Sequence, residues 1–429
     1  MGKPTNKQLT NSKFGPWGWS MILYAFLLYY FWAGLSVDAL NVYPEAFAAL
    51  HGWDPNVLLG FATPAGIIGV LGGIVFGRLV MKTGVRILCT FTLVLTGLLY
   101  IWFGHVNSPV LFLVCLTLFT FISNAFGLIG TSTLMNNWFP RKKGIALGWA
   151  TMGAPLCTAT FVAILSGLFG KFGVPTGCTI VGVFVVIFGL ASLVWVKDYP
   201  HDVGAYPDNI RDEGVDLKAQ AEAVRSHKSA FTVSKLLRDK DMWCMALGFG
   251  LLWMVTVGIV SQFVPRMISV GNSQPTALMM LTVAAVVGLF GSYFWGWLDQ
   301  KIGTKTASVI YSASYIIALL LLIFAKLPIF TYIAIVFVGL GIGGLLNLMP
   351  SMVISVYGKY DFTAANSLVS PIASLLQKFA FLIMAVLLGV SGGDYALPYG
   401  VFIVIDVIGA ALLLCVTGKC KGKQDETQQ

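Results

Sequence analysis

The stretch N-N-W-F-P-R-K-K-G-I-A-L-G, Asn136 to Gly148, decides the fold of this chain. It lies between two long apolar runs, 109–135 and 144–170. Three adjacent cations occupy its middle: Arg141, Lys142 and Lys143. Short cytoplasmic loops of membrane proteins collect Lys and Arg. The stretch is therefore predicted to be a cytoplasmic turn between two membrane-spanning helices.

The residues on either side of the cations support this turn. Pro140 ends the incoming helix because proline fixes its own φ and restricts the residue before it. The outgoing helix begins with small residues, Gly144, Ala146 and Gly148. Small residues let a neighbouring helix approach closely. We therefore expect another helix to pack against the start of this one.

Composition places the whole chain in a membrane. The chain is 57% hydrophobic and 10% charged, with a mean hydropathy of +0.83, whereas soluble domains carry about 25% charged residues. The net charge of +9 does not indicate nucleic acid, because the cations lie in short loops between apolar runs. Seven cysteines without C-x-x-C spacing are interpreted as core residues. We expect no metal and no cofactor.

The apolar runs predict an all-α membrane protein with twelve transmembrane helices, since a spanning helix needs about 20 apolar residues. The predicted spans are 17–42, 56–78, 87–104, 109–135, 144–170, 174–196, 242–265, 276–298, 305–325, 329–354, 366–390 and 397–417. Residues 1–196 would form an N-terminal six-helix bundle and 242–429 a C-terminal six-helix bundle with a short basic tail. The polar stretch 197–241 would be a cytoplasmic linker, with an amphipathic helix around 216–225.

Charge asymmetry predicts the orientation. With the N-terminus inside, the outer loops hold only three cations, Lys171, Arg266 and Lys326. The short inner loops and tails hold fifteen: Lys3, Lys7, Lys13, Arg78, Lys82, Arg86, Arg141, Lys142, Lys143, Lys301, Lys305, Lys359, Lys419, Lys421 and Lys423. By the positive-inside rule both termini and the linker are cytoplasmic.

The two halves also repeat each other. Gly77 to Arg86 reads G-R-L-V-M-K-T-G-V-R, and Gly296 to Lys305 reads G-W-L-D-Q-K-I-G-T-K. The basic turn at Arg141 has a weaker counterpart at Lys359, in V-Y-G-K-Y-D-F. The interval between the two turns equals the interval between the two loops to within one position. Two landmarks at nearly one interval predict a tandem repeat, which in transporters builds two bundles around a midplane site.

The repeated loops resemble those of the major facilitator superfamily over essentially the whole chain. The matching positions are Gly77, Lys82, Gly84 and Arg86 in the first half, and Gly296, Lys301 and Gly303 in the second. The family has an acid at the fifth position, where this chain has Met81 and Gln300, with Asp299 one residue early. The chain therefore departs from the family at the acid of its loop-locking charge relay.

Three motifs narrow the resemblance to the monocarboxylate transporters and the oxalate–formate antiporter family. They are W-G-W at Trp17–Trp19, W-F-P-R-K-K-G-x-A-x-G at the basic turn, and D-Y-P-H-D-V-G-A-Y-P-D-N from Asp198 to Asn209. This resemblance implies a carrier of small organic anions in a bacterial inner membrane. It also implies that the carrier works as a symporter or an antiporter by alternating access.

The chain departs from these relatives where they bind substrate. The relatives' arginine in the eighth helix aligns with Ser292, and an acid of the proton-coupled relatives aligns with Gly288. Oxalate-carrying relatives have a lysine in the eleventh helix at the place of Ser374, whereas this chain has Lys378 one turn further on. A dianion held by two buried cations is therefore not expected.

Three ionisable residues fall inside the predicted spans: Asp38, Lys378 and Asp406. Each is a functional candidate because charge inside a bilayer is costly. Lys378 and Asp406 lie at nearly the same depth on consecutive helices. They form either a structural ion pair or a site in which Lys378 attracts a substrate carboxylate. Asp38 is either a solvated helix-end residue or a protonatable group for coupling or gating.

Neutral polar residues would complete a pocket by analogy with the family. They are Asn124, Gln262, Ser292, Asn347, Ser370, Ser374 and Gln377. The alternative is that they form hydrogen bonds between helices. No set of residues with catalytic spacing converges in the spans, so an enzyme is not expected.

The sequence thus predicts a monomeric secondary carrier of a small organic acid, most simply a monocarboxylate. Protons or a counter-anion would drive it, because no nucleotide-binding loop is present. Two alternatives share the fold. One is an efflux pump for drugs or lipophilic compounds, and the other is a membrane sensor that no longer transports.

Overall fold

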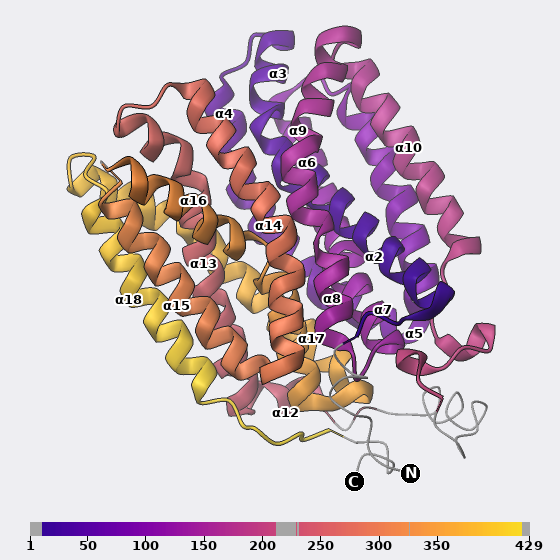
Figure 1. Cartoon of the computed structure of the whole chain (residues 1–429). Helices are drawn as coiled ribbons and strands as arrows, with labels where there is room; N and C mark the ends of the chain where they lie inside the picture. Colours follow the sequence, from indigo (N-terminus) through magenta and orange to yellow (C-terminus); the bar gives the residue numbers. More distant parts are fainter. Residues whose placement is uncertain (1–10, 212–228, 230, 326, 423–429) are drawn as a thin grey trace. The chain divides into compact units, whose positions relative to one another are not determined.

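The computed structural model describes residues 11–211, 229, 231–325 and 327–422, and all of their regular structure is helical (Figure 1). The predicted amphipathic helix around 216–225 lies outside the described residues. The chain divides into two compact units. We call Lys13–Pro140 with Leu156–Lys228 the N-unit, and Met1–Ser12, Arg141–Pro155 and Ser229–Gln429 the C-unit. The predicted bundles 1–196 and 242–429 remain a prediction.

The helices of the N-unit follow the order of the chain. They are α2 (Gly15–Ser36), the 3₁₀ helix η1 (Asp38–Asn41), α3 (Tyr43–His51), α4 (Pro55–Gly60), α5 (Ala62–Phe103), α6 (Pro109–Asn124), the π-helical segment η2 (Ala125–Gly130), α7 (Thr131–Trp138), α9 (Gly153–Phe172), α10 (Val174–Trp195), η3 (Pro200–Val203) and η4 (Pro207–Asn209). The boundary between the units falls inside α9.

The C-unit contains one helix from the middle of the chain and seven from its later part. They are α8 (Lys143–Thr151), α12 (Val233–Leu237), α13 (Lys240–Ser269), α14 (Gln274–Ile302), α15 (Thr304–Ile323), α16 (Pro328–Ile342), α17 (Leu345–Val390) and α18 (Ala396–Leu414).

Among the described residues, ten helical segments are long and apolar enough to cross a membrane. Two of them hold two crossings each, because the chain reverses inside them. The reversal is at Gly84 in α5 (φ 78°, ψ 170°) and at Gly358 in α17 (φ 73°, ψ 175°). Glycine adopts this positive φ without the steric cost that a side chain would add. With α16 and the first part of α17 as one crossing, the described helices correspond to the twelve predicted spans.

Three predicted spans are less regular than expected. The first helix ends at Ser36, and 3₁₀ helix η1 follows it. The fourth span contains the π-helical segment η2. The tenth, predicted as continuous over 329–354, breaks between α16 and α17 at Gly343 and Gly344. A Cβ atom on Gly343 would lie 1.9 Å from the Ser292 hydroxyl of α14. Glycine at this position therefore lets α14 approach the backbone closely at the break between α16 and α17.

Glycines set the distances between helices in both units. In the N-unit, a Cβ atom on either Gly97 or Gly182 would lie 2.6 Å from the carbonyl oxygen of the other. In the C-unit, a Cβ atom on Gly296 of α14 would lie 2.2 Å from the carbonyl oxygen of Gly144 in α8. This confirms that a helix packs against the small residues that follow the basic turn. Such contacts replace the hydrophobic effect as the source of helix association in lipid.

Candidate functional site

Lys378 lies in the middle of a membrane-spanning segment. It falls between the Gly358 turn of α17 and the end of that helix at Val390, somewhat nearer to the latter. At 1.5 Å per residue the nearer end is roughly 18 Å away, which places Lys378 well inside a hydrocarbon core about 30 Å thick. The side chain is half-buried. Among the described residues it makes no hydrogen bond and no ion pair.

Other polar side chains lie on the same face of α17. Ser370, Ser374 and Lys378 recur every four residues, which places them one above another on a helix. Ser370 is buried, and Ser374 and Gln377 are half-buried. Within the described part of the chain, neither Ser374 nor Gln377 forms a side-chain hydrogen bond. The second part of α17 therefore presents one cation with uncommitted polar groups beside it.

Asp406 is fully buried in α18, but its contacts differ from those predicted. The Ser312 hydroxyl of α15 donates a hydrogen bond to Oδ2 of Asp406. The second oxygen, Oδ1, has no partner among the described residues. The predicted ion pair between Lys378 and Asp406 is therefore absent from the part of the chain that the structure describes. The sequence predicts nearly the same depth for the two residues, but Asp406 faces Ser312 on α15.

Asp38 is buried rather than solvated. It begins η1, directly after α2, and its side chain is 9% exposed. The Thr158 hydroxyl of α9 donates to its carboxylate over 3.0 Å. The interpretation of Asp38 as a solvated helix-end residue is therefore wrong. A buried carboxylate held by the Thr158 hydroxyl and the Cys157 thiol remains a candidate for proton exchange.

Four of the neutral candidates form hydrogen bonds between helices. The Asn124 amide donates to the Gly69 carbonyl over 2.8 Å. The Asn347 amide likewise donates to the carbonyl of Ser292 over 2.8 Å. Asn347 and Ser292 are both fully buried. Gln262 accepts from the Tyr395 hydroxyl over 3.3 Å. These contacts favour packing as the role of Asn124, Gln262, Ser292 and Asn347, which was the alternative open from the sequence.

In the N-unit, the repeated loop that contains Gly84 and Arg86 is contacted by Asp198, an acidic residue far away in the sequence. Asp198 Oδ1 accepts from the backbone N–H of Arg86 over 2.8 Å. Burial raises the pKa of Asp198, although the hydrogen bond from Arg86 opposes this effect. A Cβ atom on Gly84 would lie 2.4 Å from Oδ2 of the same carboxylate. Asp198 thus caps the helix that follows the turn. The motif around Asp198 is visible in the sequence, but this role is not, because Asp198 and Arg86 are 112 positions apart.

In the C-unit, the repeated loop that begins at Gly296 forms hydrogen bonds with the basic turn. Gln300, at the position of the family acid, donates to the Arg141 carbonyl over 2.8 Å and accepts from the Gly144 N–H over 3.3 Å. Asp299 is buried and accepts from the Ser351 hydroxyl over 2.5 Å. Glutamine at this position therefore holds the start of α8 through neutral hydrogen bonds.

Two lysines of the basic turn, Lys142 and Lys143, are also engaged inside the C-unit. The Lys143 ammonium donates to the Ser351 carbonyl over 2.8 Å and to the Ser355 hydroxyl. Lys142 is 2% exposed and donates to Asn11 over 3.0 Å. These lysines do more than orient the chain in a membrane, because they hold α8 to α17 and to residues before α2. In the other loops, Lys82 is exposed, and the Lys301 ammonium lies over the Trp297 ring.

No group of three or more His, Cys, Asp or Glu residues that could hold a metal ion occurs within the described ranges.

Comparisons with known proteins identify the family. The family model of the Major Facilitator Superfamily matches residues 20–377. The "Oxalate:formate antiporter" of Oxalobacter formigenes is 26% identical over 293 residues, which are 66% of this chain and 64% of the relative. The match thus spans just under two thirds of that relative. The "Uncharacterized MFS-type transporter YhjX" of Escherichia coli (strain K12) is 21% identical over 288 residues, 66% of this chain and 67% of the relative.

Solved structures share the fold. The proton:xylose symporter XylE, bound to 6-bromo-6-deoxy-D-glucose, superposes with a TM-score of 0.76 at 15% identity, covering 95% of this chain and 98% of that one. The human organic anion transporter MFSD10 (TETRAN) superposes with a TM-score of 0.66 at 13% identity, covering 96% and 100%. The predicted fold class, an all-α membrane protein of twelve transmembrane helices, is confirmed.

Proposed function

This chain belongs to the major facilitator superfamily and is a multi-pass membrane transporter rather than an enzyme, and we propose that it carries a small organic anion, most simply a monocarboxylate. The observation that carries the proposal is Lys378, a half-buried cation at mid-span without a protein partner among the described residues. Ser374 and Gln377 would supply hydrogen bonds to the carboxylate beside it.

A lysine in the middle of a span is expensive, and such residues normally pair with an acid or mark a substrate path. Because Asp406 is engaged with Ser312 instead, the paired alternative loses its support. An anionic substrate would provide the missing charge, through a charge-assisted hydrogen bond to the ammonium.

The number of cations in the proposed site, one, favours a substrate with a single carboxylate. One ammonium matches one carboxylate, and Ser292 stands where related carriers have an arginine. A relative bearing the name of an oxalate:formate antiporter supports small organic acids as the class to test, with a monocarboxylate such as formate favoured over the dianion. Asp38 is the candidate proton-coupling group, so proton symport and anion exchange are both within the proposal.

The same proposal covers location and assembly. The bacterial relatives support a bacterial inner membrane, and the charge asymmetry supports cytoplasmic termini and linker. We propose that the carrier is a monomer with protons or a counter-anion as its other partners. It would work by alternating access, in which the repeats move around a midplane site.

Counterflow in proteoliposomes tests this function. Vesicles containing purified protein and unlabelled formate, oxalate, lactate or acetate should accumulate the matching radiolabelled acid, with the monocarboxylates faster than oxalate. Uptake of tetraphenylphosphonium without any carboxylate flux would favour the efflux pump instead. Absence of any flux from well-folded protein would favour the sensor.

A pair of variants tests the role of Lys378. Lys378→Gln should weaken carboxylate binding about tenfold or more, since a charged hydrogen bond contributes about 1.5–3 kcal/mol. Lys378→Arg keeps the charge and should retain measurable exchange. Yield and melting temperature of both variants serve as controls for folding. Unchanged affinity in Lys378→Gln would refute the substrate role.

A further inference from the structure

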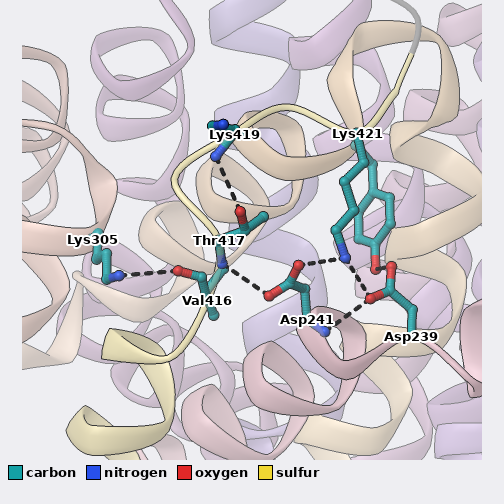
Figure 2. A network of polar contacts seen from close by, with 8 residues as sticks. Asp239, Asp241, Lys305, Val416, Thr417, Lys419 and Lys421 are labelled. Carbon is teal, nitrogen blue, oxygen red and sulfur yellow. Dashed lines mark hydrogen bonds and ion pairs between the residues drawn. The ribbon is translucent and has the colours of Figure 1, made fainter.

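Residues 415–422 follow α18 and cross the ends of other elements of the C-unit (Figure 2). We call this segment the strap. The Lys305 ammonium, at the start of α15, donates to the Val416 carbonyl over 3.0 Å. The Thr417 N–H donates to the Asp241 carboxylate, at the start of α13, over 2.9 Å. The strap has no helix of its own, so contacts of this kind define its path.

One lysine of the strap holds two carboxylates (Figure 2). The Lys421 ammonium lies 2.6 Å from Asp239 Oδ1 and also pairs with Asp241. Asp239 accepts a further hydrogen bond from the Tyr357 hydroxyl of α17 over 2.9 Å. Burial alone would raise the pKa of Asp239, but the bond from Lys421 and those from Asp241 and Tyr357 lower it. Without the ammonium, two like charges would face each other at the start of α13.

The strap also covers the turn inside α17. The Lys421 N–H donates to the Val356 carbonyl over 2.6 Å, just before the Gly358 reversal. Carbonyls at the end of a helical stretch lack intrahelical partners, so this bond satisfies one of them. A Cβ atom on Gly422 would lie 1.6 Å from the Tyr357 carbonyl oxygen. Only glycine at 422 permits this approach.

The N-unit repeats part of this arrangement. After α10, the Lys197 carbonyl accepts from the indole of the last residue of α7 over 2.8 Å, and Asp198 accepts from Arg86. Lys197 and Val416 are separated by the same interval in the sequence as Arg86 and Lys305. In each unit, the segment after the last helix returns to the same loop of the repeat.

We propose that the strap is a brace that locks the Gly358 turn of α17 to the start of α13 through Lys421. Its partners among the described residues lie inside the C-unit, so a movement of the units relative to each other need not break it. The brace keeps the two crossings of α17 in a fixed relation. This proposal does not depend on which substrate is carried.

Cys420 is a native reporter of the strap. Its side chain is half-buried and its thiol contacts the Gly422 carbonyl over 3.8 Å, whereas Cys415 is exposed and the other five cysteines are buried. In a Cys415→Ser background, maleimide labelling of Cys420 in purified protein reports opening of the strap. Lys421→Gln should speed this labelling at least about fivefold, and Lys421→Arg should restore the slow rate.

Hydrogen exchange shows whether the strap holds the turn. Lys421→Gln should also increase exchange in peptides covering 355–362 and 239–243. Lys419→Gln is the matched control, because Lys419 lies in the same segment with an exposed side chain and the substitution removes the same charge. Equal effects of the two substitutions would overturn the proposal. Faster labelling of Cys420 without faster exchange at 355–362 would also overturn it.

Discussion

Replacing Gly296 by alanine should separate α14 from α8. The contact lies inside the C-unit and is made by backbone atoms on both sides. A Cβ atom at position 296 would lie 2.2 Å from the Gly144 carbonyl oxygen and 2.8 Å from the Gly148 Cα atom. No flexible side chain can move aside, so one helix has to shift by roughly 1 Å to restore ordinary van der Waals distances.

The expected loss follows from that shift. Inserting a methyl group into a well-packed interior costs about 1–3 kcal/mol, and two rigid backbone contacts place Gly296→Ala in the upper part of that range. For a chain of 429 residues, a loss of about 2–3 kcal/mol lowers the apparent melting temperature by about 2–3 °C, since the entropy of unfolding is about 2.1 cal/mol/K per residue. The measurement is thermal unfolding of purified protein in detergent at a fixed scan rate, because irreversible unfolding makes the midpoint depend on that rate.

Gly400→Ala in α18 is the matched control. Gly400 also lies inside a membrane helix, but a Cβ atom there meets nothing within 4 Å. Removing a helical glycine without a clash should be neutral or stabilising by up to about 1 kcal/mol. The reasoning is refuted if Gly296→Ala melts within about 1 °C of the parent protein, or if both substitutions lower the midpoint equally.

Three further predictions concern the ionisable groups. Asp38→Asn should abolish proton-driven accumulation of labelled formate but spare formate exchange. Normal accumulation by this variant would exclude the Asp38 carboxylate from proton coupling. In a double-mutant cycle for stability, Lys378→Gln and Asp406→Asn should be additive within about 0.5 kcal/mol, whereas an ion pair would leave a stranded charge costing about 3–5 kcal/mol. The labelling rate of the strap cysteine, divided at each pH by the rate for the Lys421→Gln variant, should stay low from about pH 5 to 9, because the division removes the ordinary rise of thiolate reactivity with pH. The lowered pKa of Asp239 keeps its charge until the pH falls through that value, and the raised pKa of Lys421 keeps its charge until the pH rises through it. A change in this ratio near neutral pH would contradict the assignment of these partners.

The number of spans could be predicted because the bilayer sets the length of each one. The tandem repeat could also be predicted from the sequence, because both halves need the same tight reversal between two membrane crossings. Gly84 and Gly303 both have a positive φ and occupy equivalent positions of the repeated loop. The close approach to Gly144 was also predictable, because small residues at a helix start have few other uses in lipid.

The partners of the buried polar groups could not be predicted in the same way. Counting residues along a helix gives depth, but the neighbour of a side chain depends on the rotation of the helix about its axis. Lys378 and Asp406 are predicted to lie at nearly the same depth, yet Asp406 faces Ser312 of α15. The cap formed by Asp198 joins residues 112 positions apart, and no local pattern reports such a contact.

These contacts change what the candidate residues can do. An amide whose hydrogens already bond to a backbone carbonyl, as in Asn124 and Asn347, would have to give up that bond to hold a substrate. A buried donor left without its partner costs about 1–3 kcal/mol, so such residues are poor ligands. Lys378 has no bond to give up among the described residues, and its desolvation in the span is already part of the cost of folding. An arriving carboxylate therefore gains the full charge-assisted contact, which is why the second part of α17, rather than the more numerous neutral groups, is where we place substrate recognition.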